Sequence, residues 1–262
     1  MSPARLFPRS AHRFLYARPM TSEPEATAAT DPSSARQRDL VALLIALVVA
    51  VVLARIVSSL TLRGAVPGPV LQVLQVLLGN VAVWVPLVFG IIWVVRRTGR
   101  DLFGRFRIEL GDLVFALGIV ILTRVFDAVL ALSFTGTTGL QPAPTLGTPD
   151  IGLLLVSGVG IVLVSPVLEE LFFRGLFQRL LAAELTPRTR WLAVLVTAFL
   201  FALAHLFLGS ATTTLGGFQV FSTTFVLGLL TGTLVAITNR VGGAIVAHVL
   251  FNAVAVVATW PR

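Results

Sequence analysis

The sequence contains no cysteine and no lysine, and only three of its 262 residues are histidine. Without cysteine the chain has no disulfide, no thiolate nucleophile and no zinc–thiolate site. Without lysine it has no serine–lysine catalytic pair. Charged residues make up 12% of the chain, against about 25% in soluble domains. With 56% hydrophobic residues and a mean hydropathy of +0.94, the composition favours a polytopic membrane protein over a soluble globular one.

Seven apolar segments divide the chain, each near the roughly 20 residues that a helix needs to cross a bilayer. They predict an all-α, polytopic transmembrane helix bundle of about seven spans. The fourth segment is the longest and contains two glutamates. The segments lie at about residues 40–60, 70–95, 112–134, 152–180, 191–209, 219–238 and 241–259.

The arginines predict how this bundle is oriented. All 20 basic residues are arginine and the net charge is +8. The N-terminal tail and the second and fourth connecting segments each contain several arginines, and the very short sixth contains Arg240. The first contains only Arg63, and the third and fifth contain none. Because arginine accumulates on the cytoplasmic side, we expect the N-terminus inside and the C-terminus outside. The charge indicates membrane orientation, and no nucleic-acid partner is expected.

The N-terminal residues 1–39 are polar and rich in Pro, Ser, Ala and Thr. This composition is typical of a disordered segment, so we expect a disordered cytoplasmic tail, with Met20 as an alternative start. Residues 40–262 then form the membrane domain. Without a signal-peptide core in the tail, we expect a multi-pass protein of the cell membrane.

Three charged residues interrupt the fourth apolar segment: Glu169, Glu170 and Arg174. A charge at the centre of a bilayer costs roughly 2.5–3.5 kcal/mol on insertion scales, so each needs a partner or a function. Residues four apart share a helix face, which predicts a structural ion pair between Glu170 and Arg174. Glu169 lies about 100° further round the helix. We interpret Glu169 as the reactive group.

Further polar groups occur in the last three segments. His205 lies in the fifth, and His248 and Asn252 lie four apart in the seventh. Carboxylate, imidazole and amide groups together can activate water and stabilise an oxyanion. Glu169, His205 and His248 are also a plausible zinc set, although no His-Glu-x-x-His motif is present. A serine nucleophile at position 157 or 165 is a weaker alternative. We interpret the pair of Arg124 and Asp127, in the third segment, as structural packing.

The depth of these groups in the membrane sets a condition on the fold. At about 1.5 Å per residue, Glu169 and His248 reach similar depths in a simple antiparallel bundle, whereas His205 does not match Glu169. The two depths match if the fourth span begins late, near Ser157, or if the fifth begins late, after Trp191. A break near Pro166, which follows Gly158 and Gly160, would also help. We therefore expect the fourth span to be irregular or tilted.

Three motifs in this order, Glu169-Glu170-x-x-x-Arg174, Phe201-x-x-x-His205 and His248-x-x-x-Asn252, resemble those of the CPBP family. The family includes the Ras-converting type of CAAX prenyl endopeptidase and bacterial Abi proteins. The motifs span residues 165–252. The resemblance implies an intramembrane endopeptidase in which Glu169 and His205 activate water, His248 and Asn252 form the oxyanion site, and Glu170 and Arg174 support them.

The resemblance leaves the cofactor and two other functions open. We expect no cofactor; the alternative is zinc on Glu169, His205 and His248. The expected partners are the lipid bilayer and a membrane-anchored peptide or protein substrate. One alternative function is a non-catalytic or immunity-type binding protein on the same scaffold. Another is a proton-coupled transporter. Transporters often consist of two duplicated halves, and the absence of an internal repeat in this sequence makes that function less favoured.

Overall fold

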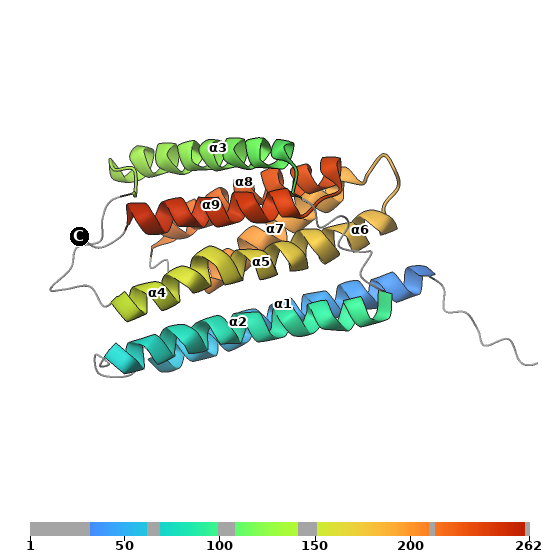
Figure 1. Cartoon of the computed structure of the whole chain (residues 1–262). Coiled ribbons are helices and arrows are strands. Elements are labelled where there is room, and N and C mark those ends of the chain that lie inside the picture. Colours follow the sequence, from blue (N-terminus) through green and yellow to red (C-terminus); the bar gives the residue numbers. More distant parts are fainter. Residues whose placement is uncertain (1–31, 62–68, 99–107, 141–150, 210–212, 260–262) are drawn as a thin grey trace, which may run out of the picture. The chain divides into compact units, whose positions relative to one another are not determined.

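The structure is a computed structural model that describes residues 32–61, 69–98, 108–140, 151–209 and 213–259 (Figure 1). The predicted tail up to residue 31, including Met20, lies outside these residues. So do parts of the connections at 62–68, 99–107, 141–150 and 210–212. The described part of the chain consists of helices and short turns, with no strand.

The seven apolar segments predicted from the sequence are all helical. Five helices are long and apolar enough to cross a membrane: α1 (Pro32–Thr61), α2 (Pro69–Thr98), α3 (Leu110–Thr135), α7 (Trp191–Leu208) and α8 (Thr214–Thr238). Helix α9 (Gly242–Ala258) is shorter and apolar, and residues 151–184 form the remaining segment. The predicted polytopic helical bundle is therefore confirmed.

The fourth segment is irregular, as we expected from the difference in membrane depth between Glu169 and His205 in a regular bundle. It runs through α4 (Ile151–Val159), a π-helical turn at Gly160–Val164, α5 (Ser165–Glu170), a second π-helical turn at Leu171–Phe177 and α6 (Gln178–Glu184). A π-helical turn contains an extra residue and changes the direction of the side chains that follow it; such turns are frequent at functional sites. Glu169 and Glu170 thus lie on a short α-helical section between two such turns.

Helix α1 begins at Pro32, whereas the sequence predicted a start near residue 40. Its first turns are held by partners distant in the sequence. Ser33 Oγ donates to Glu184 Oε2 at 2.7 Å, and Arg36 pairs with the same carboxylate. Further along the helix, Asp39 pairs with Arg97 at 3.3 Å. These contacts extend the helix into a stretch that its composition marks as disordered.

The fourth segment lies at the centre of the bundle (Figure 1). On one side it packs against α1 and α2, and on the other α5 packs against α9. One apolar core joins α1, α2, the second π-helical turn and α7, and includes Leu43, Leu87, Phe172 and Phe201. A second core joins α3, α8 and α9. The glutamates therefore sit between two packed layers rather than on the lipid-facing surface.

A polar contact ties α3 to α8 and α9. Arg124 Nη1 lies 3.2 Å from Asp127 Oδ2, so the predicted ion pair is present. The Arg124 guanidinium also donates to the Phe251 carbonyl, and Asp127 accepts from Gln219 and Thr223 at 3.0 and 2.9 Å. Because each charge is held by groups from neighbouring helices, the pair acts in packing.

The close approach of α7 and α8 depends on Gly228. A Cβ at this position would lie 3.1 Å from Ala198 Cα and 3.2 Å from an Arg174 guanidinium nitrogen. Overpacking of this kind costs about 1–3 kcal/mol. We expect Gly228→Ala to lower the unfolding temperature of the detergent-solubilised protein.

The same substitution at Gly118 is the matched control. A Cβ there would meet nothing within 4 Å, so Gly118→Ala is expected to leave stability unchanged or to raise it by up to about 1 kcal/mol through helix propensity. If both variants change the unfolding temperature by the same amount, close packing of α7 and α8 at Gly228 is not what limits stability there.

Candidate active site

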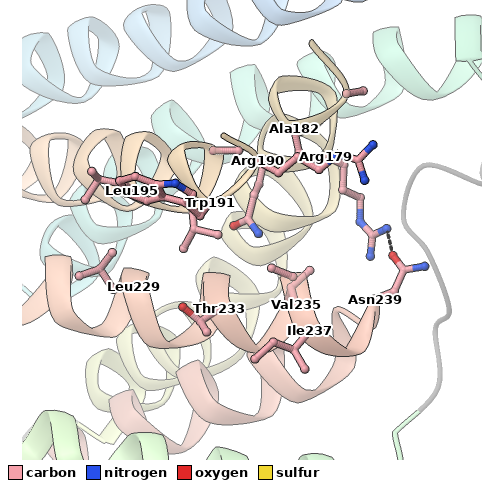
Figure 2. A pocket seen from close by; sticks show the side chains of 15 residues that line it. Arg179, Ala182, Arg190, Trp191, Leu195, Leu229, Thr233, Val235, Ile237 and Asn239 are labelled. Carbon is pink, nitrogen blue, oxygen red and sulfur yellow. Dashed lines mark hydrogen bonds between the residues drawn. The ribbon is translucent and has the colours of Figure 1, made fainter. Parts of the chain in front are cut away.

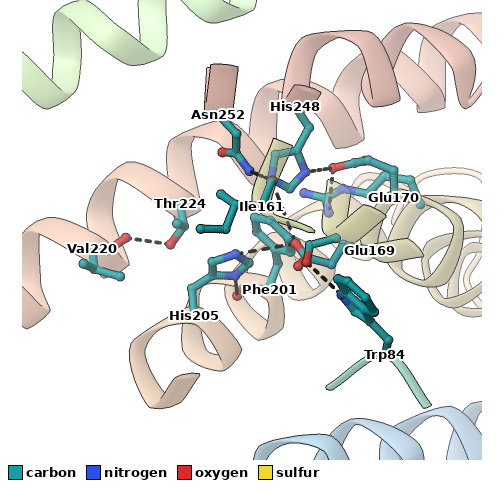
Figure 3. Close-up of polar contacts among 12 residues, drawn as sticks. Trp84, Ile161, Glu169, Glu170, Phe201, His205, Val220, Thr224, His248 and Asn252 are labelled. Atoms are coloured by element: carbon teal, nitrogen blue, oxygen red, sulfur yellow. Dashed lines mark hydrogen bonds and ion pairs between the residues drawn. The ribbon is translucent and has the colours of Figure 1, made fainter. Parts of the chain in front are cut away.

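The glutamates and the two membrane histidines meet at the centre of the bundle. Glu169 and Glu170 come from α5, His205 from the last turn of α7, and His248 from the second turn of α9. Figure 3 shows both imidazole rings turned toward Glu169. The second π-helical turn begins directly after Glu170. Three segments that are distant in the sequence thus supply one cluster.

The cluster is centred on Glu169 Oε2. This oxygen lies 3.5 Å from His205 Nε2 and 3.9 Å from His248 Nε2. The Glu169 side chain is 12% exposed, that of His205 27% and that of His248 3%. The mismatch in depth between His205 and Glu169 in a regular bundle is therefore absent from the folded chain. Of these three side chains, that of His205 is the most exposed.

Each histidine is oriented by a contact of its other nitrogen. His205 Nδ1 lies 2.9 Å from the Phe201 carbonyl, and His248 Nδ1 lies 3.0 Å from Glu170 Oε1. Since a carbonyl and a carboxylate only accept hydrogen bonds, these contacts assign the Nδ1 proton in both rings. In the neutral rings, Nε2 therefore presents a lone pair toward Glu169.

The predicted pair of Glu170 and Arg174 is present, and its charges are fully buried. Arg174 Nη1 lies 3.3 Å from Glu170 Oε1, and both side chains are 0% exposed. The guanidinium also lies over the Phe201 ring, 4.2 Å from its centroid, a cation–π geometry. Glu170 thus serves two partners, since the same oxygen accepts from His248. The sequence predicted its contact with the arginine but not its contact with the histidine.

Asn252 has a different environment from the one the sequence suggested. Its Nδ2 donates to the carbonyl of Ile161 at 2.8 Å, inside the first π-helical turn (Figure 3). One of the two amide hydrogens is therefore engaged in holding α9 against the fourth segment. Glu169, His205 and His248 come together, whereas Asn252 lies beside them with its donor directed to the backbone.

Two aromatic residues lie near the cluster: Phe201, which begins the second motif, and Trp84, which the sequence analysis did not single out. Phe201 is 0% exposed; its ring centroid lies 4.3 Å from that of His205 and 5.6 Å from that of His248. Trp84 Nε1 on α2 donates to Ser165 Oγ at 2.9 Å, one helical turn before Glu169. An indole N–H within an apolar span needs an acceptor, and this is the one clue by which Trp84 could have been found.

The donor set fits a divalent metal ion. The ligating atoms of Glu169, His205 and His248 all lie within 4.8 Å of one another. One carboxylate and two histidines are a common catalytic zinc set, with bonds of about 2.0–2.2 Å. Metal-bound histidines usually donate their second nitrogen to a carbonyl or carboxylate, as His205 and His248 do here.

One of three comparisons with known proteins found a match, and its range contains this site. Residues 151–254 match the family model described as type II CAAX prenyl endopeptidase Rce1-like. The comparisons with curated proteins and with solved structures returned no match. This match covers less than half of the chain and confirms the resemblance that the motifs indicate. All the residues of the three motifs lie within the matched range, and α1, α2 and α3 lie outside it.

Proposed function

We propose that this multi-pass membrane protein is an intramembrane endopeptidase that hydrolyses a peptide bond of a membrane-associated protein or peptide. The observation that carries the proposal is the convergence of two oriented His Nε2 atoms on Glu169 Oε2, at 3.5 and 3.9 Å. The match of residues 151–254 to the model of an endopeptidase family supports it. Ionisable groups inside a membrane bundle are themselves a mark of function.

The first step is attack by water. A water molecule between Glu169 and His205 gives one proton to the Glu169 carboxylate and a hydrogen bond to His205 Nε2. The oxygen that remains attacks the carbonyl carbon of the substrate, forming a C–O bond while the carbonyl electron pair moves to its oxygen. General-base catalysis requires the base within hydrogen-bond reach of this proton, and Glu169 has an oxygen without a hydrogen-bond partner among the described residues.

The second step is collapse of the tetrahedral intermediate. His248, when protonated at both nitrogens, donates from Nε2 to the oxyanion, and the Glu170 carboxylate at Nδ1 balances its charge. The C–N bond then breaks as Glu169 returns its proton to the leaving amine, giving a carboxylic acid and an amine. Asn252 supports this geometry by its bond to Ile161, and its second N–H is the remaining candidate oxyanion donor.

The substrate is proposed to reach the site from the His205 side, since His205 is the most exposed of the three groups. A peptide segment held in or against the bilayer fits a site enclosed by membrane helices. The predicted orientation, with the N-terminus inside, and the cell membrane as the location remain part of this proposal.

The direct test is cleavage of membrane-anchored peptides by the full chain in proteoliposomes, followed by mass spectrometry. The peptides would carry either a prenylated cysteine or a transmembrane anchor, so that the class of substrate is read out together with the cut site. We expect a defined cut in at least one class. Binding of peptides of both classes without any cut would support the binding-protein alternative.

Cleavage is also expected to survive removal of metal ions, because Glu169 supplies the base. Zinc bound by Glu169, His205 and His248 would instead supply a Lewis acid and an activated water. The measurement compares peptide cleavage before and after treatment with a chelator, with metal content determined on the same samples. A chelator saturated with calcium is the control. If the chelator abolishes cleavage and stoichiometric zinc restores it, the metal-free mechanism is wrong. Glu169, His205 and His248 would then be the zinc ligands.

A further inference from the structure

A cavity in the described part of the chain lies away from the Glu169 cluster. It has a volume of about 780 Å³ and lies between α6, α7 and α8 (Figure 2). Its walls come from α6, the start of α7 and the C-terminal part of α8. No residue of the Glu169 cluster lines it, so it has no place in the proposed reaction.

The cavity is polar at one end and apolar at the other. Arg179 and Asn239 lie at one end in Figure 2, and Leu195 and Leu229 at the opposite end. Asn239 directly follows the last residue of α8, whereas Leu229 lies within that helix. At about 1.5 Å per residue, the apolar end is roughly 15 Å deeper along the helix than the polar end. The cavity thus extends from the helix ends toward the membrane interior.

The polar end has unused hydrogen-bond donors and a positive charge. Arg179 Nη1 donates to Asn239 Oδ1, but its Nε and Nη2 atoms are buried and have no hydrogen-bond partner among the described residues. Arg190 also lines the cavity, and its side chain is exposed. No acidic residue is among the lining residues. Two guanidinium groups in a cavity whose described lining holds no carboxylate suit a phosphate group, which arginine binds through paired donors.

The outer rim of the cavity is exposed and apolar. Trp191 is 62% exposed and Ile237 79% exposed, and both line the cavity. Tryptophan is enriched at the level of the lipid headgroups, which agrees with the position of Trp191 at the first residue of α7. A ligand with a charged head and a long apolar tail fits this arrangement better than a small anion does.

We propose that this cavity binds an anionic phospholipid, with its phosphate at Arg179 and Arg190 and an acyl chain along Val194, Leu195 and Leu229. In the predicted orientation the site opens to the cytoplasmic leaflet, where anionic lipids attract basic residues. The proposal concerns a site separate from the Glu169 cluster, so it stands or falls independently of peptidase activity.

The charged end is tested by native mass spectrometry of the full chain in detergent, titrated with phosphatidylglycerol or phosphatidylcholine. We expect preference for phosphatidylglycerol, and about a five-fold loss of that affinity in Arg179→Gln and in Arg190→Gln, from roughly 1 kcal/mol per basic residue near the surface. Arg188→Gln is the matched control, since Arg188 is exposed in the same connection but does not line the cavity. Equal affinity for the two lipids, or an equal loss in the control, would overturn the proposal.

The apolar end is tested without changing the charge. Thr233 lines the cavity and is exposed, so Thr233→Phe is expected to fill part of it and weaken phosphatidylglycerol binding while leaving the unfolding temperature unchanged. Inorganic phosphate at millimolar concentration is the second arm. Weak competition by phosphate supports a lipid site; full displacement of the lipid by phosphate, together with unaltered binding in Thr233→Phe, would indicate a small-anion site instead.

Discussion

Replacement of Glu169 by glutamine is expected to lower kcat for peptide cleavage by about 10²–10⁴-fold, the usual contribution of a general base. The amide keeps the size of the side chain but cannot accept the proton of water. Its oxygen would still lie near His205 and His248, 3.5 and 3.9 Å from their Nε2 atoms in the wild type. We therefore expect the unfolding temperature to change little and KM to change less than kcat.

The measurement is a rate determined on reconstituted protein with the best membrane-anchored peptide found for the wild type. Glu109→Gln is the control, because Glu109 is a carboxylate next to the first residue of α3, paired with Arg240 and 43% exposed. It should cleave at the wild-type rate. Wild-type kcat in Glu169→Gln would exclude Glu169 as the base and remove the main support for the proposed mechanism.

Substitution of Arg174 by methionine is expected to lower the free energy of unfolding by about 3–5 kcal/mol, the range for breaking a buried ion pair from one side. The Glu170 carboxylate, 0% exposed, would lose its counter-ion at 3.3 Å. The cation–π contact with Phe201 would be lost as well. Glu170 orients His248, so cleavage is also expected to fall.

The ion pair is isolated by a double-mutant cycle with Glu170→Gln. Because the uncompensated charge is then removed, the double variant Glu170→Gln/Arg174→Met is expected to be more stable than Arg174→Met alone. Denaturant titration in detergent measures the free energy of unfolding of the three variants. Arg188→Met, at an exposed position, should stay within about 0.5 kcal/mol of the wild type. Additive effects of the two single changes would show that the pair is not coupled.

Local features of the sequence were sufficient for the span assignment and for part of the site. Seven apolar segments predict seven helical segments because a bilayer leaves the backbone few alternatives. The contact of Glu170 with Arg174 follows from their spacing on one helix, and the structure has it at 3.3 Å. The placement of His248 and Asn252 on one side of α9 is local in the same way.

Contacts between distant segments were decided by the tertiary structure. His205 on α7 approaches Glu169, which lies on α5 between the two π-helical turns, and spacing along the chain does not specify this contact. The direction of the Asn252 amide is set by the Ile161 carbonyl, which lies on another segment.

The N-terminal end of α1 shows the same distinction. Its composition is that of a disordered tail, yet the helix begins at Pro32 because Ser33 and Arg36 bind Glu184, about 150 residues away. The sequence by itself therefore determined which segments form apolar helices and which charges pair within one helix, since hydropathy and helix geometry act over a few turns. The tertiary structure alone decided which polar groups from different segments meet, since that depends on packing across the whole bundle.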